Sequence, residues 1–154
     1  MAEKQITIGT KTHVLDRLFF VIATQNPIET EGTYPLPIAQ IDRFIMKLSL
    51  GYPSQEVEEA IVADDPSHKI MPGIKPICGK NTVLAMMDFA DKIFCDKKLI
   101  KAVVAITTSS RKHRGIEWGA SPRASLALVQ AAKAYAFLNH RDYVIDQDVI
   151  DLAP

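Results

Sequence analysis

The feature that most constrains the fold is a run of six consecutive apolar residues, Leu18 to Ala23. The chain then turns polar and is interrupted by Pro27. A short continuous apolar run of this kind is typical of a strand buried on both faces, as in parallel sheets covered by helices. The sequence therefore predicts a buried strand over residues 18–24. Asn26 would lie at the carboxyl end of that strand, where open α/β sheets bind their ligands.

The rest of the N-terminal third is predicted to contain short strands and one short helix. Residues 5–8 alternate polar and apolar and precede Gly9, which predicts a hairpin whose second strand begins at residue 11. A short helix is expected over residues 38–43. Alternation from Phe44 to Leu50 then predicts one more strand. This part of the chain is therefore expected to form an α/β unit.

The sequence pattern changes from strand-like to helical at Gly51-Tyr52-Pro53, which is the best candidate for a domain boundary. The clearest helix start beyond it is Ser121-Pro122, because serine is a favoured N-cap and proline a favoured first residue. The predicted helices run from Ser54 to before Pro66, from Asn81 or Thr82 to Phe94, from 97 to 111, from 121 to 139, and onward from Asp146, with a loop at 66–80. The predicted fold class is therefore α/β plus α.

The composition argues against several classes of function. The chain has 18 basic and 18 acidic residues, so no net charge attracts it to nucleic acid or to an anionic membrane. No apolar run approaches the roughly 20 residues that span a bilayer, and the N-terminus lacks the apolar core of a signal peptide. Cys78 and Cys95 form no CxxC motif, and the four histidines show no metal-ligand spacing. A reduced, cytoplasmic setting is expected.

Three residues could carry chemistry, and each has a plain structural alternative. Asn26 could orient an attacking water or touch a phosphate, or it could satisfy backbone groups before Pro27. Arg43, which follows Asp42, could form a surface ion pair. Arg123 falls in the first turn of a predicted helix, where a cation faces the positive end of the helix dipole. A bound anion would resolve that conflict, and otherwise the side chain would swing into solvent.

Two blocks of sequence resemble the MoxR family of AAA+ ATPases. The first is ATQNPIETEGTYPLP followed by AQIDRF and LSLGYPS, and the second is GASPRASLALVQAAKAYAFLNHRDYV at residues 119–144. The resemblance implies that Asn26 is the family's sensor 1, that Arg43 is the arginine finger reaching a neighbouring subunit's ATP, and that Arg123 is sensor 2. One departure is Ile38, where the family usually has an acidic residue.

The resemblance also implies an architecture and an activity. Residues 1–52 would be the C-terminal part of the AAA+ core, and residues 53–154 its helical lid. The intact protein would hydrolyse ATP with Mg²⁺ in a ring, typically a hexamer. It would use that energy for chaperone-like remodelling of partner proteins, or for insertion of metals into them. Partners of the family often contain von Willebrand factor A domains.

The sequence contains no credible Walker A or Walker B motif. The stretch from Gly73 to Asn81 mimics a phosphate loop, but five residues separate its glycines and Asn81 replaces the required Ser or Thr. The chain is therefore expected to lack the first half of such an ATPase. We expect it to be inactive alone, because nothing supplies the backbone nest for the β-phosphate.

Two other functions stay open from the residues. The chain could be a non-enzymatic interaction or assembly module, which the absence of Walker motifs favours. The basic run Arg111-Lys112-His113-Arg114, with Trp118 nearby, could contact nucleic acid. A solvated surface is the more common role of such a run, and a net charge of zero disfavours a DNA-binding domain.

Overall fold

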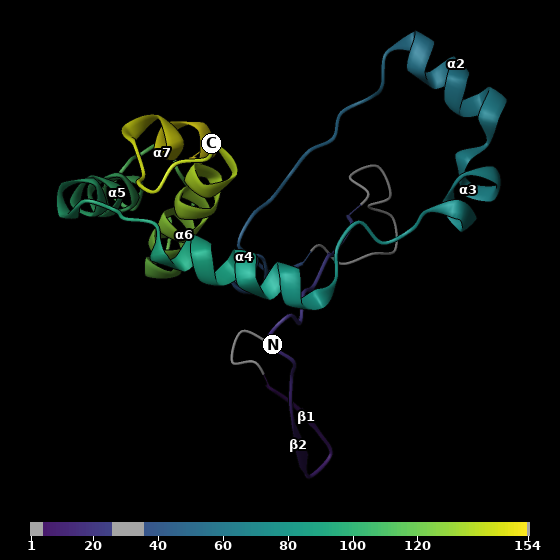
Figure 1. The fold of residues 1–154 in the computed structure, drawn as a ribbon. Coiled ribbons are helices and arrows are strands. Elements are labelled where there is room, and N and C mark those ends of the chain that lie inside the picture. Colours follow the sequence, from purple (N-terminus) through teal and green to yellow (C-terminus); the bar gives the residue numbers. More distant parts are fainter. Residues whose placement is uncertain (1–4, 26–35, 154) are drawn as a thin grey trace.

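The computed structural model of the chain describes residues 5–25 and 36–153. Figure 1 shows a short hairpin near the N-terminus, a long connecting path, and a group of helices that contains the C-terminal third. The elements are β1 (Gln5–Ile8), β2 (Lys11–Val14), α1 (Ile38–Ile41), α2 (Gln55–Asp64), α3 (Pro66–Lys69), the 3₁₀ helix η1 (Met71–Gly73), α4 (Lys80–Lys92), α5 (Lys97–Ser110), α6 (Pro122–Leu138) and α7 (Asp146–Leu152).

The predicted hairpin is confirmed. Strands β1 and β2 pair antiparallel, with Gln5 opposite Val14 and Ile8 opposite Lys11. Gly9 in the connecting turn has a φ of +62°, in the left-handed region that glycine adopts without steric cost. Within the described residues this hairpin is the whole of the regular sheet.

The buried strand predicted at residues 18–24 is wrong for this structure, and so is the strand predicted from Phe44 to Leu50. Both stretches lack regular strand pairing. Adjacent residues of a strand point to opposite faces. Phe19 is 45% exposed and Phe20 is 74% exposed, so neither face of the first stretch is covered. A strand exists only when neighbours complete its ladder of hydrogen bonds. Because no described strand runs alongside these segments, their apolar patterns do not produce strands here.

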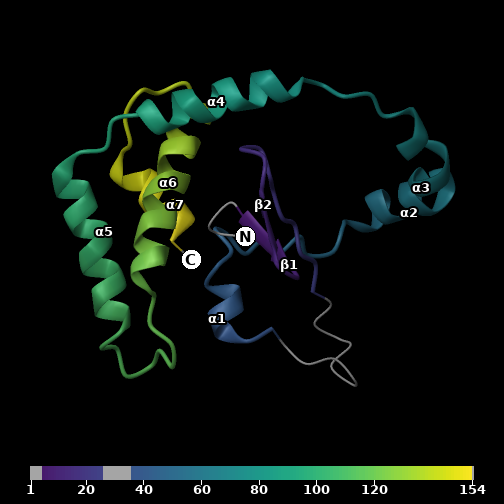
Figure 2. The ribbon, with the colours of Figure 1, turned by 90° about the horizontal axis from the view of Figure 1, so that it is seen from below.

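The hydrophobic core lies among the helices of the C-terminal half. Helix α6 packs against α4, α5 and α7 (Figure 2). Its two fully buried residues, Ala132 and Ala136, are small, so neighbouring helices can approach its backbone closely. Phe89 of α4 and Phe137 of α6 stack with ring centroids 6.4 Å apart. The buried apolar residues of the described chain are Ile93, Leu99, Val103, Ala132, Ala136, Val144 and Val149.

The helix boundaries follow local signals, with three corrections. Ser121 caps α6 and Pro122 begins it, as predicted. The region predicted as a loop at 66–80 instead begins with α3 and η1, because Pro66 occupies a first helical position that suits its fixed φ. Helix α4 begins at Lys80, after Gly79, rather than at Asn81 or Thr82. The cap of α7 is Ile145 rather than Asp146.

Helix α7 is fastened to the bundle by the segment that precedes it. The backbone N–H of Phe94 donates to Asp142 O, and that of Val144 donates to Phe94 O, both at 2.9 Å. Arg141 donates to both carboxylate oxygens of Asp148, which is 1% exposed. This bidentate ion pair holds the segment before α7 against the helix itself.

Polar contacts join the N-terminal segment to the helices. Asp16 accepts from Lys80 Nζ at 2.5 Å, and Arg17 forms an ion pair with Asp88 of α4. The third contact, at Asp42, is described below. The division into residues 1–52 and 53–154 stays a prediction. None of the helices in the described part of the chain combines the length and apolarity needed to cross a membrane.

Candidate functional site at the start of helix α6

The candidate site is built around the first turn of α6. A helix begins with backbone N–H groups that have no partner within the helix. Ser121 Oγ accepts from two of them, Arg123 N at 3.2 Å and Ala124 N at 3.3 Å. The same hydroxyl donates to Asp42 Oδ1 at 2.6 Å. The cap is therefore part of a contact between α6 and a turn far away in the sequence.

Arg123 completes this contact. Its Nη1 donates to Asp42 Oδ2 at 2.8 Å, so both carboxylate oxygens of Asp42 are bound at the start of α6. The Arg123 side chain is half-exposed, and that of Asp42 is less exposed. The unfavourable position of a cation at a helix start is thus balanced by an anion, which is one of the two outcomes that the charge argument left open. The anion is a carboxylate of the chain itself.

Arg43 follows Asp42 directly in the turn that ends α1. Its backbone N–H donates to Gln40 O at 3.2 Å, and the side chain is exposed. Arg43 forms no ion pair with any residue that the structure describes, so the surface pair considered from the sequence is not found there. Arg43 is therefore an exposed residue directly after Asp42, the residue that binds Arg123.

The structure brings together two of the three predicted site residues. The turn that carries Arg43 is held against the start of α6 through Asp42, next to Arg123. Asn26 lies outside the described residues, and its prediction stays untested. Sequence reasoning missed Ser121 and Asp42 as partners. Ser121 was recognised only as a cap, and no local pattern reveals that Asp42 reaches a residue 81 positions away.

The chemistry of this site suits a bound anion better than a metal. Two guanidinium groups are near one turn, and guanidinium is a strong partner for phosphate. Across the described residues no group of three or more His, Cys, Asp or Glu side chains could hold a metal ion. The residues described therefore do not fit Mg²⁺ by themselves. Burial raises the pKa of the Cys95 thiol, which disfavours the thiolate form.

Comparisons with known proteins match both parts of this contact. Residues 1–46 match the family model described as the ATPase family associated with various cellular activities, and residues 108–154 match the AAA lid domain. The chain is 40% identical over 163 residues to the chaperone MoxR1 of Mycobacterium tuberculosis, which covers 100% of this chain and 43% of the relative. It is 27% identical to protein MoxR of Paracoccus denitrificans, over 97% of this chain and 49% of the relative. The chain belongs to the MoxR family of AAA+ ATPases.

Other relatives agree with this membership. YeaC, an uncharacterized protein of Bacillus subtilis, is 43% identical over 100% of this chain and 48% of its own length. A crystal structure of a Cytophaga hutchinsonii protein assigned as an ATPase is 39% identical, with a TM-score of 0.83. It covers 98% of this chain and 48% of that protein. The chain thus spans about half the length of the curated relatives that it matches.

Membership in the MoxR family confirms the predicted fold class, the C-terminal part of an AAA+ core followed by a helical lid. It also gives the Asp42 contact a place in that fold. Asp42 lies in the segment that matches the ATPase model, and Ser121 and Arg123 lie in the segment that matches the lid model. Their contact therefore joins the two parts of the AAA+ unit.

Proposed function

We propose that this chain is the sensor and lid portion of a MoxR-type ATPase that couples ATP binding and hydrolysis to chaperone-like remodelling of client proteins, or to metal insertion into them. The observation that carries the proposal is the joint placement of Arg123 and the turn bearing Arg43 around Asp42. An AAA+ machine needs the lid to sense the nucleotide held by the core. A polar contact between the two parts supplies a connection of the required kind.

Each candidate residue has a defined role in this proposal. Asn26 orients the attacking water. Arg123 places a positive charge near the nucleotide from the lid, and Arg43 reaches the nucleotide of a neighbouring subunit in a ring. Positive charge at that point stabilises the charge that develops on the transferred phosphoryl group. Mg²⁺ and the phosphate cradle would come from Walker motifs, which these 154 residues do not contain, so we derive no step through the metal.

The pairing of Arg123 with Asp42 adds a condition to its role. A phosphate that reaches Arg123 must replace a carboxylate at 2.8 Å, so the exchange trades one charged hydrogen bond for another. Because the guanidinium is half-exposed, this exchange needs no opening of the hydrophobic core. We expect Arg123 to report the presence of nucleotide by exchanging Asp42 for a phosphate.

The clients of this ATPase are proposed from the family alone. Proteins with von Willebrand factor A domains are the expected partners, and a ring of about six subunits is the expected assembly. A non-enzymatic interaction or assembly module is the alternative. The two functions differ in one measurable property, which is their dependence on nucleotide. Only the ATPase requires Arg43 and Arg123 to contact nucleotide.

The test begins with the 154-residue chain and a fluorescent ATP analogue in the presence of Mg²⁺. We expect no binding in the micromolar range, because sensor residues without a phosphate cradle hold nucleotide weakly. Micromolar binding that is lost in Arg123→Ala would contradict the proposal that this chain has the sensor residues but lacks the phosphate cradle. It would mean that the chain contains a complete phosphate site.

The second step is to read the coding sequence upstream of Met1. A G-x-x-x-x-G-K-[ST] motif after a strand, roughly one hundred residues earlier, would allow the longer protein to be assayed. In that protein Arg43→Ala should lower ATP turnover by about a thousandfold. Lys47→Ala, an exposed cation four residues further along, is the matched control and should leave turnover unchanged. An in-frame stop upstream, or no ATP turnover by the longer protein, would favour the assembly module. Equal turnover in Arg43→Ala and Lys47→Ala would contradict the role proposed for Arg43.

A further inference from the structure

The helix α2 and the loop at residues 111–118 are two surfaces that the proposed nucleotide chemistry does not use. Figures 1 and 2 place α2 and α3 far from α5 and from the loop that follows α5. One surface is acidic and the other basic. Each also carries exposed apolar side chains. We infer that α2 of one copy of the chain binds the 111–118 loop of a second copy.

Helix α2 lacks the packing that normally stabilises a helix of its length. It has 10 residues, and isolated helices of that length are marginal in water. No residue of α2 is buried, and Val57, Ile61 and Val62 are all exposed. Helix stability in proteins comes chiefly from packing of an apolar face. Within the described chain no such packing covers α2, so a partner surface is needed to do so.

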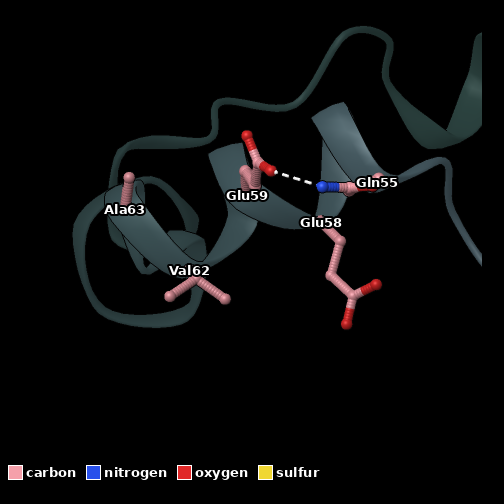
Figure 3. Close-up of a pocket in the computed structure, with 5 residues that line it drawn as sticks. All are labelled: Gln55, Glu58, Glu59, Val62 and Ala63. Carbon is pink, nitrogen blue, oxygen red and sulfur yellow. Dashed lines mark hydrogen bonds between the residues drawn. The ribbon is translucent and has the colours of Figure 1, made fainter.

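The charge of α2 specifies the kind of partner. Residues 54–65 contain five acidic residues and no basic one. One face of the helix forms a shallow hollow in which Val62 and Ala63 lie beside Glu58 and Glu59 (Figure 3). Glu59 accepts a hydrogen bond from Gln55 at 3.0 Å, whereas Glu58 points away from that pair. An apolar patch beside acids fits a segment that presents both an apolar group and positive charge.

The 111–118 loop has the matching composition. It carries Arg111, Lys112 and Arg114 against a single acid, Glu117. Trp118, the only tryptophan of the chain, is 65% exposed. Neither Lys112 nor Arg114 has an ion-pair partner within the part of the chain that the structure describes. Tryptophan and arginine are the residues most enriched at the centres of protein interfaces.

The loop is also held in a defined shape, which lowers the entropy cost of binding. Arg111 Nε donates to Ala120 O at 2.6 Å, and Ala120 N donates to Ser110 Oγ at 2.9 Å. Gly115 N donates to His113 Nδ1 at 3.1 Å. These bonds close the loop at its base and leave Lys112, Arg114 and Trp118 exposed. The loop therefore presents its basic and aromatic groups without first having to fold.

The contact must be made between copies, because α2 and the loop of one chain lie apart. Two different surfaces that meet head to tail produce a ring when the rotation closes, or a filament when it does not. The inference rests on the ring assembly proposed above and names the surfaces that build it. It uses no nucleotide, so its failure can be distinguished from a failure of the proposed ATPase.

The experiment exchanges the charges of the two surfaces. Glu58→Lys/Glu59→Lys replaces the two acids of the α2 hollow with lysines, and Lys112→Glu/Arg114→Glu makes the 111–118 loop acidic. Sedimentation at low salt should show that the wild-type chain associates and that each variant alone is weakened by at least about tenfold. An equimolar mixture of the two variants should associate as the wild type does, because every contact is again between opposite charges. Lys97→Glu/Lys101→Glu on α5, with the same change of charge, should leave association intact.

Trp118 gives a second measurement in the same samples. Its fluorescence emission should shift to shorter wavelength when the wild type or the mixture associates, and should not shift in either variant alone. Circular dichroism checks that the variants keep their helices. A wild-type chain that stays monomeric would overturn the interface. Association that persists in both variants would overturn the interface alone. The interface would also be overturned if Lys112→Glu/Arg114→Glu lost binding to an oligonucleotide but still associated.

Discussion

Asp42 and Arg123 are 81 residues apart in the sequence, yet their carboxylate and guanidinium groups meet at 2.8 Å. The pair lies at the junction of the segment that matches the ATPase model and the segment that matches the lid model. Because Arg123 is half-exposed, the pair contributes only about 0–1 kcal/mol to stability. Its importance is positional, since it fixes where the turn carrying Arg43 meets α6.

Ser121 should matter more to stability than the Asp42–Arg123 pair does. Ser121→Ala leaves two backbone N–H groups at the start of α6 without their acceptor and removes the donor to Asp42. We expect it to lower the free energy of unfolding by about 1–2 kcal/mol, as measured by urea denaturation. Ser109→Ala is the matched control, because Ser109 is exposed on the neighbouring helix α5 and its hydroxyl caps nothing. Equal stability of the two variants would contradict the capping role.

The start of α6 also shows which features of the fold could be predicted from the sequence. The cap, the first proline and the end of this helix near Asn139 were predicted because they depend on a few adjacent residues. The strand predicted at residues 18–24 was wrong because an apolar run becomes a strand only beside other strands. Asp42 was missed as the partner of Arg123 because a long-range ion pair leaves no local pattern.

The roles of the site residues remain predictions for a related reason. The family resemblance placed Asn26, Arg43 and Arg123 at positions that act on nucleotide, and the physical argument for Arg123 left open a bound anion or a side chain in solvent. Charge alone could not distinguish a bound phosphate from a carboxylate of the same chain. In the structure the anion that Arg123 contacts is Asp42.

Gly119 is required by the close approach of the chain to itself in the loop between α5 and α6. A Cβ atom at this position would lie 2.4 Å from Arg111 Cα and 2.7 Å from Arg111 N. These are backbone atoms of a loop closed by hydrogen bonds, so they cannot simply rotate away. We expect Gly119→Ala to lower the free energy of unfolding by about 1–3 kcal/mol. Amide hydrogen exchange should also be faster at the end of α5.

Gly115→Ala is the control for Gly119→Ala, because it adds the same methyl group to the same loop. Its Cβ would meet only the imidazole ring of His113, at 3.3 Å, and that side chain is exposed and can shift. We expect a change in the free energy of unfolding within about 0.5 kcal/mol. A Gly115→Ala variant as unstable as Gly119→Ala would show that the loop resists any added side chain, rather than this one close approach.

Asp148 and Arg141 should make the stability of the helical bundle depend on pH. Hydrogen bonds from Arg141 hold the pKa of the Asp148 carboxyl below the ordinary value for aspartate. In the unfolded chain the carboxyl returns to a pKa of about 3.9. Between the two values the unfolded state binds more protons than the folded state. The stabilisation is therefore fully present above the unfolded pKa and is lost as the pH falls through the lower folded value.

Asp148→Asn tests this pair directly. The change leaves the guanidinium of Arg141 partly buried opposite a neutral group, where it had a carboxylate at 2.5 and 2.8 Å. At pH 7 we expect a loss of about 3 kcal/mol in the free energy of unfolding. The difference from wild type should shrink as the pH is lowered through the acid range. Asp142→Asn, at an exposed carboxylate directly after Arg141, is the control and should change the free energy of unfolding little at pH 7. A difference between Asp148→Asn and wild type that stays constant from pH 7 to pH 2 would show that the ion pair contributes nothing beyond packing.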